Sequence, residues 1–88
     1  MEKQHYVAIR DDGAILGVIL GAREKEVKSN LRAALASRYQ VHTSHFTFTS
    51  FEAHGSDYRA VVHIPADAGT FENEEEIHLE AVTVHGKV

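Results

Sequence analysis

Seven of the 88 residues are histidine, a side chain that binds metals and transfers protons near neutral pH. His42 and His45 are three residues apart, a spacing that puts them on opposite faces of a strand, so we do not expect them to share a metal ion. His45 and His63 come diagonally close on one sheet face in the strand pairing described below. Zinc needs a third or fourth ligand, and neither H-E-x-x-H nor a helical H-x3-H pair occurs. We therefore predict no metal site and leave a site at His45 and His63 as the open alternative.

Serine and glycine patterns offer little support for catalysis. Ser44, Ser50 and Ser56 lie near histidines in the sequence, but neighbouring residues of a strand point to opposite faces. No G-x-S-x-G turn occurs, and the glycines match neither common phosphate-binding pattern. A thin domain also offers few walls for a pocket. We predict that the chain is not an enzyme and has no catalytic residue, no cofactor and no small-molecule ligand.

Composition narrows the class of protein further. A chain of 88 residues without cysteine predicts one domain, residues 1–88, with no disulfide and no thiolate metal site. No apolar run reaches 18 residues and no basic-then-apolar leader opens the chain, so we expect a soluble cytoplasmic protein with no membrane partner. The net charge of −4 disfavours nucleic acid as a partner. The acidic residues within 72–76 are expected in a solvated loop, with a docking patch for a basic partner as the alternative.

The hydrophobic pattern predicts five strands and one helix. The expected elements are strands at 5–10 and 14–20, a helix at 23–39, and strands at 41–53, 57–64 and 77–85. Asp12-Gly13 predicts a two-residue hairpin loop. The helix carries one apolar stripe, formed by Val27, Leu31, Ala34 and Leu35. The fold class is therefore α+β, a two-layer sandwich in the order β-β-α-β-β-β, with one antiparallel sheet of about five strands and a single amphipathic helix on one face.

The first hairpin is apolar on both faces. Pairing outward from a two-residue loop gives one aliphatic face that we expect the helix to cover, formed by Val7, Ile9, Leu16 and Val18. In the second hairpin the expected covered face carries Phe46, Phe48, Val62 and Ile64. The last strand has apolar residues on both faces, which predicts either a bulge near Glu80–Ala81 or cover on both sides.

One helix covers one face, so the opposite face of the sheet is where we expect contacts with other molecules. The predicted interaction residues there are Tyr6, Ile15, Ile19, Phe51, Arg59 and Val61. Contiguous apolar patches are uncommon on monomers, so we predict an accessory or adaptor protein that binds a protein partner or itself through this face or an edge strand. Scattered exposed residues on a monomer are the alternative for this surface. The alternative function is a small nucleic-acid-binding module that uses the basic helix and the sheet aromatics.

Overall fold

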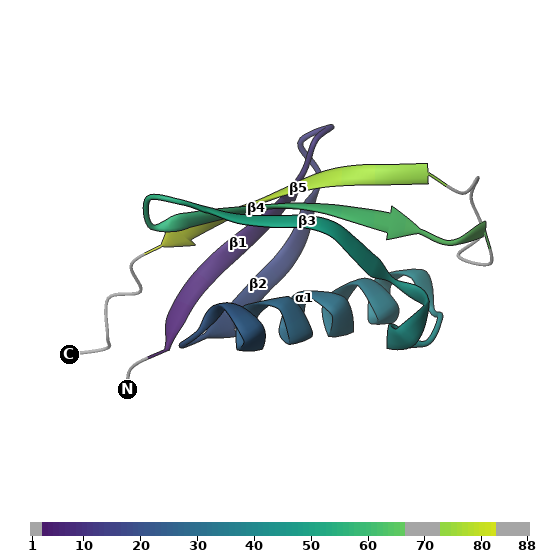
Figure 1. Ribbon diagram of the computed structural model, residues 1–88, viewed down its shortest axis with the longest axis horizontal. Helices are drawn as coiled ribbons and strands as arrows, with labels where there is room; N and C mark the ends of the chain where they lie inside the picture. The colour runs from purple at the N-terminus through teal and green to yellow at the C-terminus, as the bar shows by residue number, and fades with distance from the viewer. Residues whose placement is uncertain (1–2, 67–72, 83–88) are drawn as a thin grey trace.

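The computed structural model describes residues 3–66 and 73–82 (Figure 1). Its elements are β1 (Gln4–Arg10), β2 (Ile15–Gly21), α1 (Glu24–Tyr39), the 3-10 turn η1 (Thr43–His45), β3 (Thr47–His54), β4 (Asp57–Ile64) and β5 (Asn73–Val82). The strands form one antiparallel sheet in the order β2-β1-β5-β4-β3. The predicted α+β class and the order β-β-α-β-β-β are confirmed.

Two strand predictions are wrong at their N-terminal ends. Residues 43–45 form the turn η1, so β3 begins only at Thr47. Strand β5 begins at Asn73, which places Glu74, Glu75 and Glu76 in a strand and not in the predicted loop, whereas Glu72 lies outside the described residues. A cationic side chain lies beside these acids: Nε of Arg59 is 3.5 Å from a carboxylate oxygen of Glu76. Strand pairing thus overrides the low β-propensity of glutamate.

The loop between β1 and β2 is one residue longer than predicted. The Gly13 N–H donates to the carbonyl of Arg10 at 2.9 Å, and the Arg10 N–H donates to the carbonyl of Ala14 at 2.8 Å. Gly13 alone takes a positive φ, 92°, whereas the predicted two-residue loop needs a second positive φ at Asp12. The loop therefore contains three residues.

A register shift in β2 compensates for the longer loop. Ile9 pairs with Ile15, and Ala8 already pairs with Gly17, so Leu16 is an extra residue on β2. From Ala8–Gly17 to the end of the hairpin, the pairing is the one predicted from the sequence.

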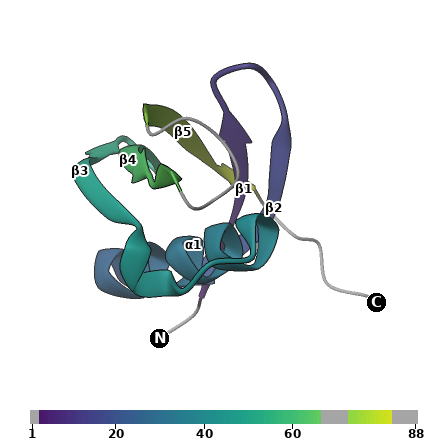
Figure 2. The same cartoon turned by 90° about the vertical axis from the view of Figure 1, so that its right-hand side faces the viewer.

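Helix α1 lies on one side of the sheet, which arches over it (Figure 2). The fully buried side chains of the helix are Val27, Leu31 and Leu35, as the predicted stripe requires. Opposite them the sheet and η1 region bury Tyr6, Ala8, Ile19, Phe46, Ala60, Val62, Ile64, Ile77 and Leu79. The covered face predicted for the second hairpin is thereby confirmed, with Phe48 partly buried against the same core.

The covered face predicted for the first hairpin is wrong. Tyr6, Ala8 and Ile19 face the helix, whereas three of the four residues expected there, Val7, Ile9 and Val18, lie on the uncovered face. Leu16 packs against the core because of its extra position. The neighbouring strand β5 decides the face, since Ala8 stands opposite the buried Leu79 and must point the same way.

Strand β5 itself needs neither of the predicted explanations. It pairs with β1 from Ile77 to Val82 without a register shift, so there is no bulge near Glu80–Ala81. Ile77 and Leu79 are buried under the helix, and Val82 stands on the uncovered face opposite His5. Val84 lies outside the described residues.

Gly21 lies where β2 meets the first turn of α1. A Cβ atom there would be 2.5 Å from Cγ2 and 3.0 Å from the backbone nitrogen of Val27. Gly21→Ala is expected to lower the free energy of unfolding by about 1–3 kcal/mol, because overpacking forces the two elements apart. Urea unfolding followed by circular dichroism measures the loss. In a Val27→Ala background the same change should cost less, and an equal loss in both backgrounds would contradict the steric explanation.

Candidate functional site

The uncovered face of the sheet divides into an aliphatic part and an ionic part. Strands β1 and β2 contribute a contiguous set of aliphatic side chains, here called the aliphatic patch: Val7, Ile9, Ile15, Val18 and Leu20. The residues of β5, β4 and β3 on the same face are mostly charged or polar: Glu74, Glu76, His78, Glu80, Arg59, His63 and Thr47. The two parts meet along the β1–β5 boundary.

The aliphatic patch is exposed as well as contiguous. Ile15, Val18 and Leu20 expose 65%, 58% and 40% of their surface. Ile9 pairs directly with Ile15, and Val7 with Val18, so the side chains contact one another across the two strands. Helix α1 lies on the other side of the sheet (Figure 2). Within residues 3–66 and 73–82, therefore, no element covers this patch.

The structure separates the six predicted interaction residues. Ile15, Arg59 and Val61 lie on the uncovered face, as predicted, but β1 and β5 stand between Ile15 and the other two. Tyr6 and Ile19 are buried under the helix, with 7% and 2% of their surface exposed, so their predicted exposure is wrong.

Phe51 was also predicted on the wrong face. The β3–β4 pairing shifts between Phe48 and Ser50, which leaves Thr49 as an extra residue. Phe51 therefore stands opposite the buried Ala60 and points to the helix side, whereas the sequence predicted Arg59 as its partner. Sequence patterns do not locate such a bulge.

The aromatic residues form a cluster on the helix side of the sheet. Ring centroids are 5.5 Å apart for Tyr6 and Tyr58, 5.1 Å for Tyr58 and Phe51, and 5.5 Å for Phe51 and Phe48. Burial, and then the nearby Tyr58, raise the pKa of Tyr6. These distances and tilted rings suit aromatic packing.

Basic helix residues pack on this cluster. The Lys28 ammonium lies 5.4 Å from the centroid of the Phe51 ring, and the Arg32 guanidinium lies 5.2 Å from that of Phe48, within the range of cation–π contacts. The aromatics that the nucleic-acid alternative needs on an open sheet face are thus packed against the helix.

The ionic part contains a hydrogen-bonded carboxylate, Asp57. Its Oδ1 accepts the Ala81 N–H at 2.9 Å, and its Oδ2 lies 3.2 Å from Nε2 of His78. The backbone hydrogen bond, with a smaller contribution from His78, lowers the pKa of Asp57 below its ordinary value. The group ties the start of β4 to the end of β5.

His42 and His45 lie on a turn and not on a strand. The prediction that they point to opposite faces of a strand is therefore wrong. Their ring centroids are 6.3 Å apart. Nδ1 of His42 accepts the Ser44 N–H at 3.1 Å and lies 2.8 Å from Ser44 Oγ. This His42–Ser44 pair caps the exposed turn η1.

Among the described residues no group of three or more His, Asp or Glu could hold a metal ion. His63, one of the two histidines of the alternative metal site, stands on β4 opposite Thr47.

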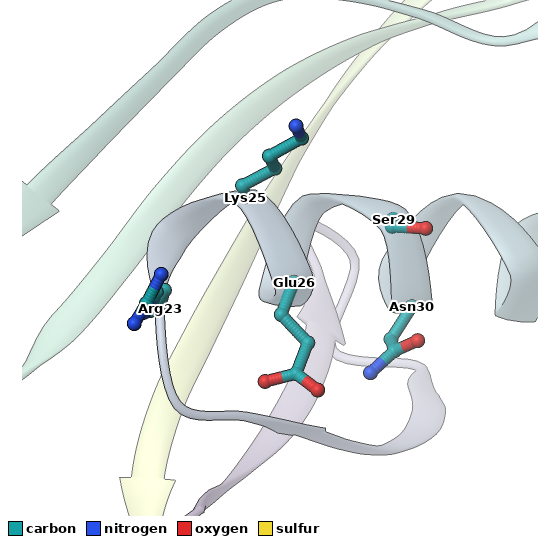
Figure 3. Close-up of a pocket in the computed structure, with 5 residues that line it drawn as sticks. All are labelled: Arg23, Lys25, Glu26, Ser29 and Asn30. Atoms are coloured by element: carbon teal, nitrogen blue, oxygen red, sulfur yellow. The ribbon is translucent and has the colours of Figure 1, made fainter. Parts of the chain in front are cut away.

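A hollow beside the start of α1 is lined by Arg23, Lys25, Glu26, Ser29 and Asn30 (Figure 3). Its two central side chains bind the end of β2. Glu26 Oε1 accepts the Ala22 N–H at 2.7 Å, and Asn30 Nδ2 donates to the Leu20 carbonyl at 2.6 Å. The backbone bond from Ala22, and then Lys3, lower the pKa of Glu26. These groups hold the helix against the sheet edge.

Both edge strands carry a feature that opposes pairing with another strand. β2 has its register shift at Leu16, and β3 has one at Thr49. Bulges of this kind twist an edge away from a regular ladder. The face of the sheet, more than its edges, is therefore open to a partner.

Comparisons with protein-family models, with curated proteins and with solved structures find no match to this chain. In the part of the chain that the structure describes, no helix is long and apolar enough to cross a membrane.

Asp57 makes the stability of the fold depend on pH. Because its pKa is lowered on folding, the ionised carboxylate stabilises the fold above the ordinary aspartate pKa, and this contribution is lost as the pH falls below about 4. Asp57→Asn keeps an acceptor oxygen but removes the charge, so it is expected to lower the free energy of unfolding by roughly 1 kcal/mol at pH 7. The difference from the unsubstituted chain should shrink at pH 3.

Urea unfolding at the two pH values measures this effect. Asp11→Asn removes an exposed carboxylate from the β1–β2 turn and controls for the loss of one negative charge. A difference for Asp57→Asn that is the same at pH 7 and pH 3 would show that the charge is not responsible.

Proposed function

We propose that this chain is a non-enzymatic protein-interaction module, an accessory or adaptor protein that binds a protein through the aliphatic patch. The observation that carries the proposal is the contiguous exposure of Ile15, Val18 and Leu20 on a sheet face without a covering element among the described residues. Large contiguous apolar patches are uncommon on the surfaces of monomeric proteins, and the largest patch on such a surface is often functional.

The chemistry of the patch favours a protein partner. Its side chains carry no charge and no hydrogen-bonding group, so they offer nothing to a phosphate backbone. The patch lies on the outer side of an arched sheet (Figure 2), whereas small-molecule sites are concave. A cytoplasmic location is part of this proposal, and the absence of cysteine accords with a reducing compartment.

A photo-crosslinking residue placed in the patch tests the proposal. Val18 and Thr47 are both β-branched, exposed and on the uncovered face, but they lie on opposite edge strands. With p-benzoylphenylalanine at position 18, irradiation in extracts of the source cells should give a discrete crosslinked product. The same residue at position 47 is the matched control and should give at least about tenfold less product, because interface energy is concentrated in the buried centre.

Mass spectrometry then identifies the crosslinked chain. Adding Leu20→Glu to the position-18 variant should remove the product, since a carboxylate in the contact opposes burial. Equal crosslinking from positions 18 and 47, or a product that survives Leu20→Glu, would contradict the proposed role of the patch.

A further inference from the structure

The ionic part of the uncovered face is strongly acidic. Strands β3, β4 and β5 place five carboxylates on this face: Glu52, Asp57, Glu74, Glu76 and Glu80. The only Lys or Arg in the three strands is Arg59, and its Nε is already 3.5 Å from a carboxylate oxygen of Glu76. With histidine neutral at pH 7, this part of the face therefore attracts cations.

Glu80 joins the ionic part to the aliphatic patch. It stands on β5 directly opposite Val7 of the patch, and its side chain is exposed. Because Tyr58 pairs with Leu79, Asp57 stands on the other side of Glu80. Within the described residues Glu80 has no hydrogen bond and no ion pair. An unpaired carboxylate at the border of an aliphatic surface favours a partner that brings a cation to that border.

The charges at the other borders of the patch nearly cancel. Beyond the β2 edge, the first turn of α1 and the residue before it carry two basic and two acidic side chains: Arg23, Lys25, Glu24 and Glu26. Nζ of Lys3 is 2.6 Å from a carboxylate oxygen of Glu26. In the β1–β2 loop Asp12 is bound to Arg10 at 2.7 Å, and Asp11 is exposed. The negative charge around the patch is therefore concentrated on its β5 side.

An aliphatic surface with an acidic border on one side selects among the classes of partner. The carboxylates repel the phosphates of nucleic acid and the anionic headgroups of a membrane. A metal ion finds no group of three ligands among the residues that the structure describes. A protein surface on which aliphatic side chains stand beside Lys or Arg complements both parts of the face.

We propose that the uncovered face binds a protein segment whose aliphatic side chains pack on the aliphatic patch and whose Lys or Arg side chains lie over β5. This inference rests on the proposed function and names the chemistry of the partner. Strands β2, β1, β5 and β4, about 4.8 Å apart and about six residues long at about 3.3 Å each, present roughly 400 Å². This area is about half of one side of a standard interface, so the contact is transient, with a dissociation constant of about 10 µM to 1 mM.

Fluorescence anisotropy of the purified full chain with two labelled peptides tests this inference. The basic peptide is an amphipathic helix of about 15 residues, with one stripe of leucines and about four lysines along one side of the stripe. In the acidic peptide glutamates replace the lysines. The chain should bind the basic peptide with a dissociation constant below about 1 mM, at least about tenfold more tightly than the acidic peptide. Raising the NaCl concentration from about 50 mM to about 500 mM should weaken this binding, because salt screens the attraction.

Substitutions separate the acidic border from the net charge of the chain. Glu80→Lys should weaken binding of the basic peptide at least about fivefold, and Glu80→Gln covers the case in which Glu80→Lys does not fold. Glu24→Lys makes the same change of charge in the first turn of α1 and should alter the affinity less than about twofold. Val18→Thr keeps the shape of valine but buries a hydroxyl, so it should weaken binding at least about threefold.

The possible outcomes separate this inference from the proposed function. Equal affinity for the two peptides, equal losses for Glu80→Lys and Glu24→Lys, or no loss for Val18→Thr overturns the inference. An excess of the basic peptide should also reduce the crosslink from position 18 in extracts. If that crosslink forms but the basic peptide neither binds nor competes, the proposed function stands with a partner of different charge and the inference fails. Without a crosslink, the proposed function fails and this inference fails with it.

Discussion

The alternation of side chains along β5, at the centre of the sheet, constrains the rest of the structure. Ile77 and Leu79 are apolar and buried, whereas His78 and Glu80 between and after them are ionisable. A strand of this kind can bury only one face. Because β1 and β4 both pair with β5 without a register shift, their side chains follow the same alternation. The helix therefore has to lie on the side of Ile77 and Leu79.

The exposed aliphatic patch is a consequence of this constraint. The β1–β2 hairpin is apolar on both faces, so either face could pack under a helix when the hairpin is considered alone. Pairing with β5 commits Tyr6 and Ala8 to the core, and Val7 and Val18 are left on the other side. The pairing with β5 fixes the side on which these residues lie and does not require that they be aliphatic. The proposed function depends on the aliphatic side chains that the chain carries there.

The same constraint explains why the aromatic residues do not serve as an open binding surface. The extra residue at Thr49 turns Phe51 toward the helix, where it joins Tyr6 and Tyr58. Lys28 then packs on the Phe51 ring. These aromatic and basic side chains are of types that suit nucleic-acid binding, but here they pack the helix against the far strands of the sheet. Residue type alone does not distinguish packing from binding.

The sequence by itself determined the types and order of the elements, the apolar stripe of the helix, and most of the pairing within the first hairpin. These follow from local periodicity and from turn residues such as Gly13, which act over a few positions. Only the tertiary structure decided which hairpin face is covered, because that depends on the pairing of β1 with a strand from the other end of the chain. It also decided the bulges at Leu16 and Thr49, and hence the sides on which Ile15 and Phe51 lie. A shift of one residue reverses every side chain beyond it, so these placements depend on contacts that a local pattern does not contain.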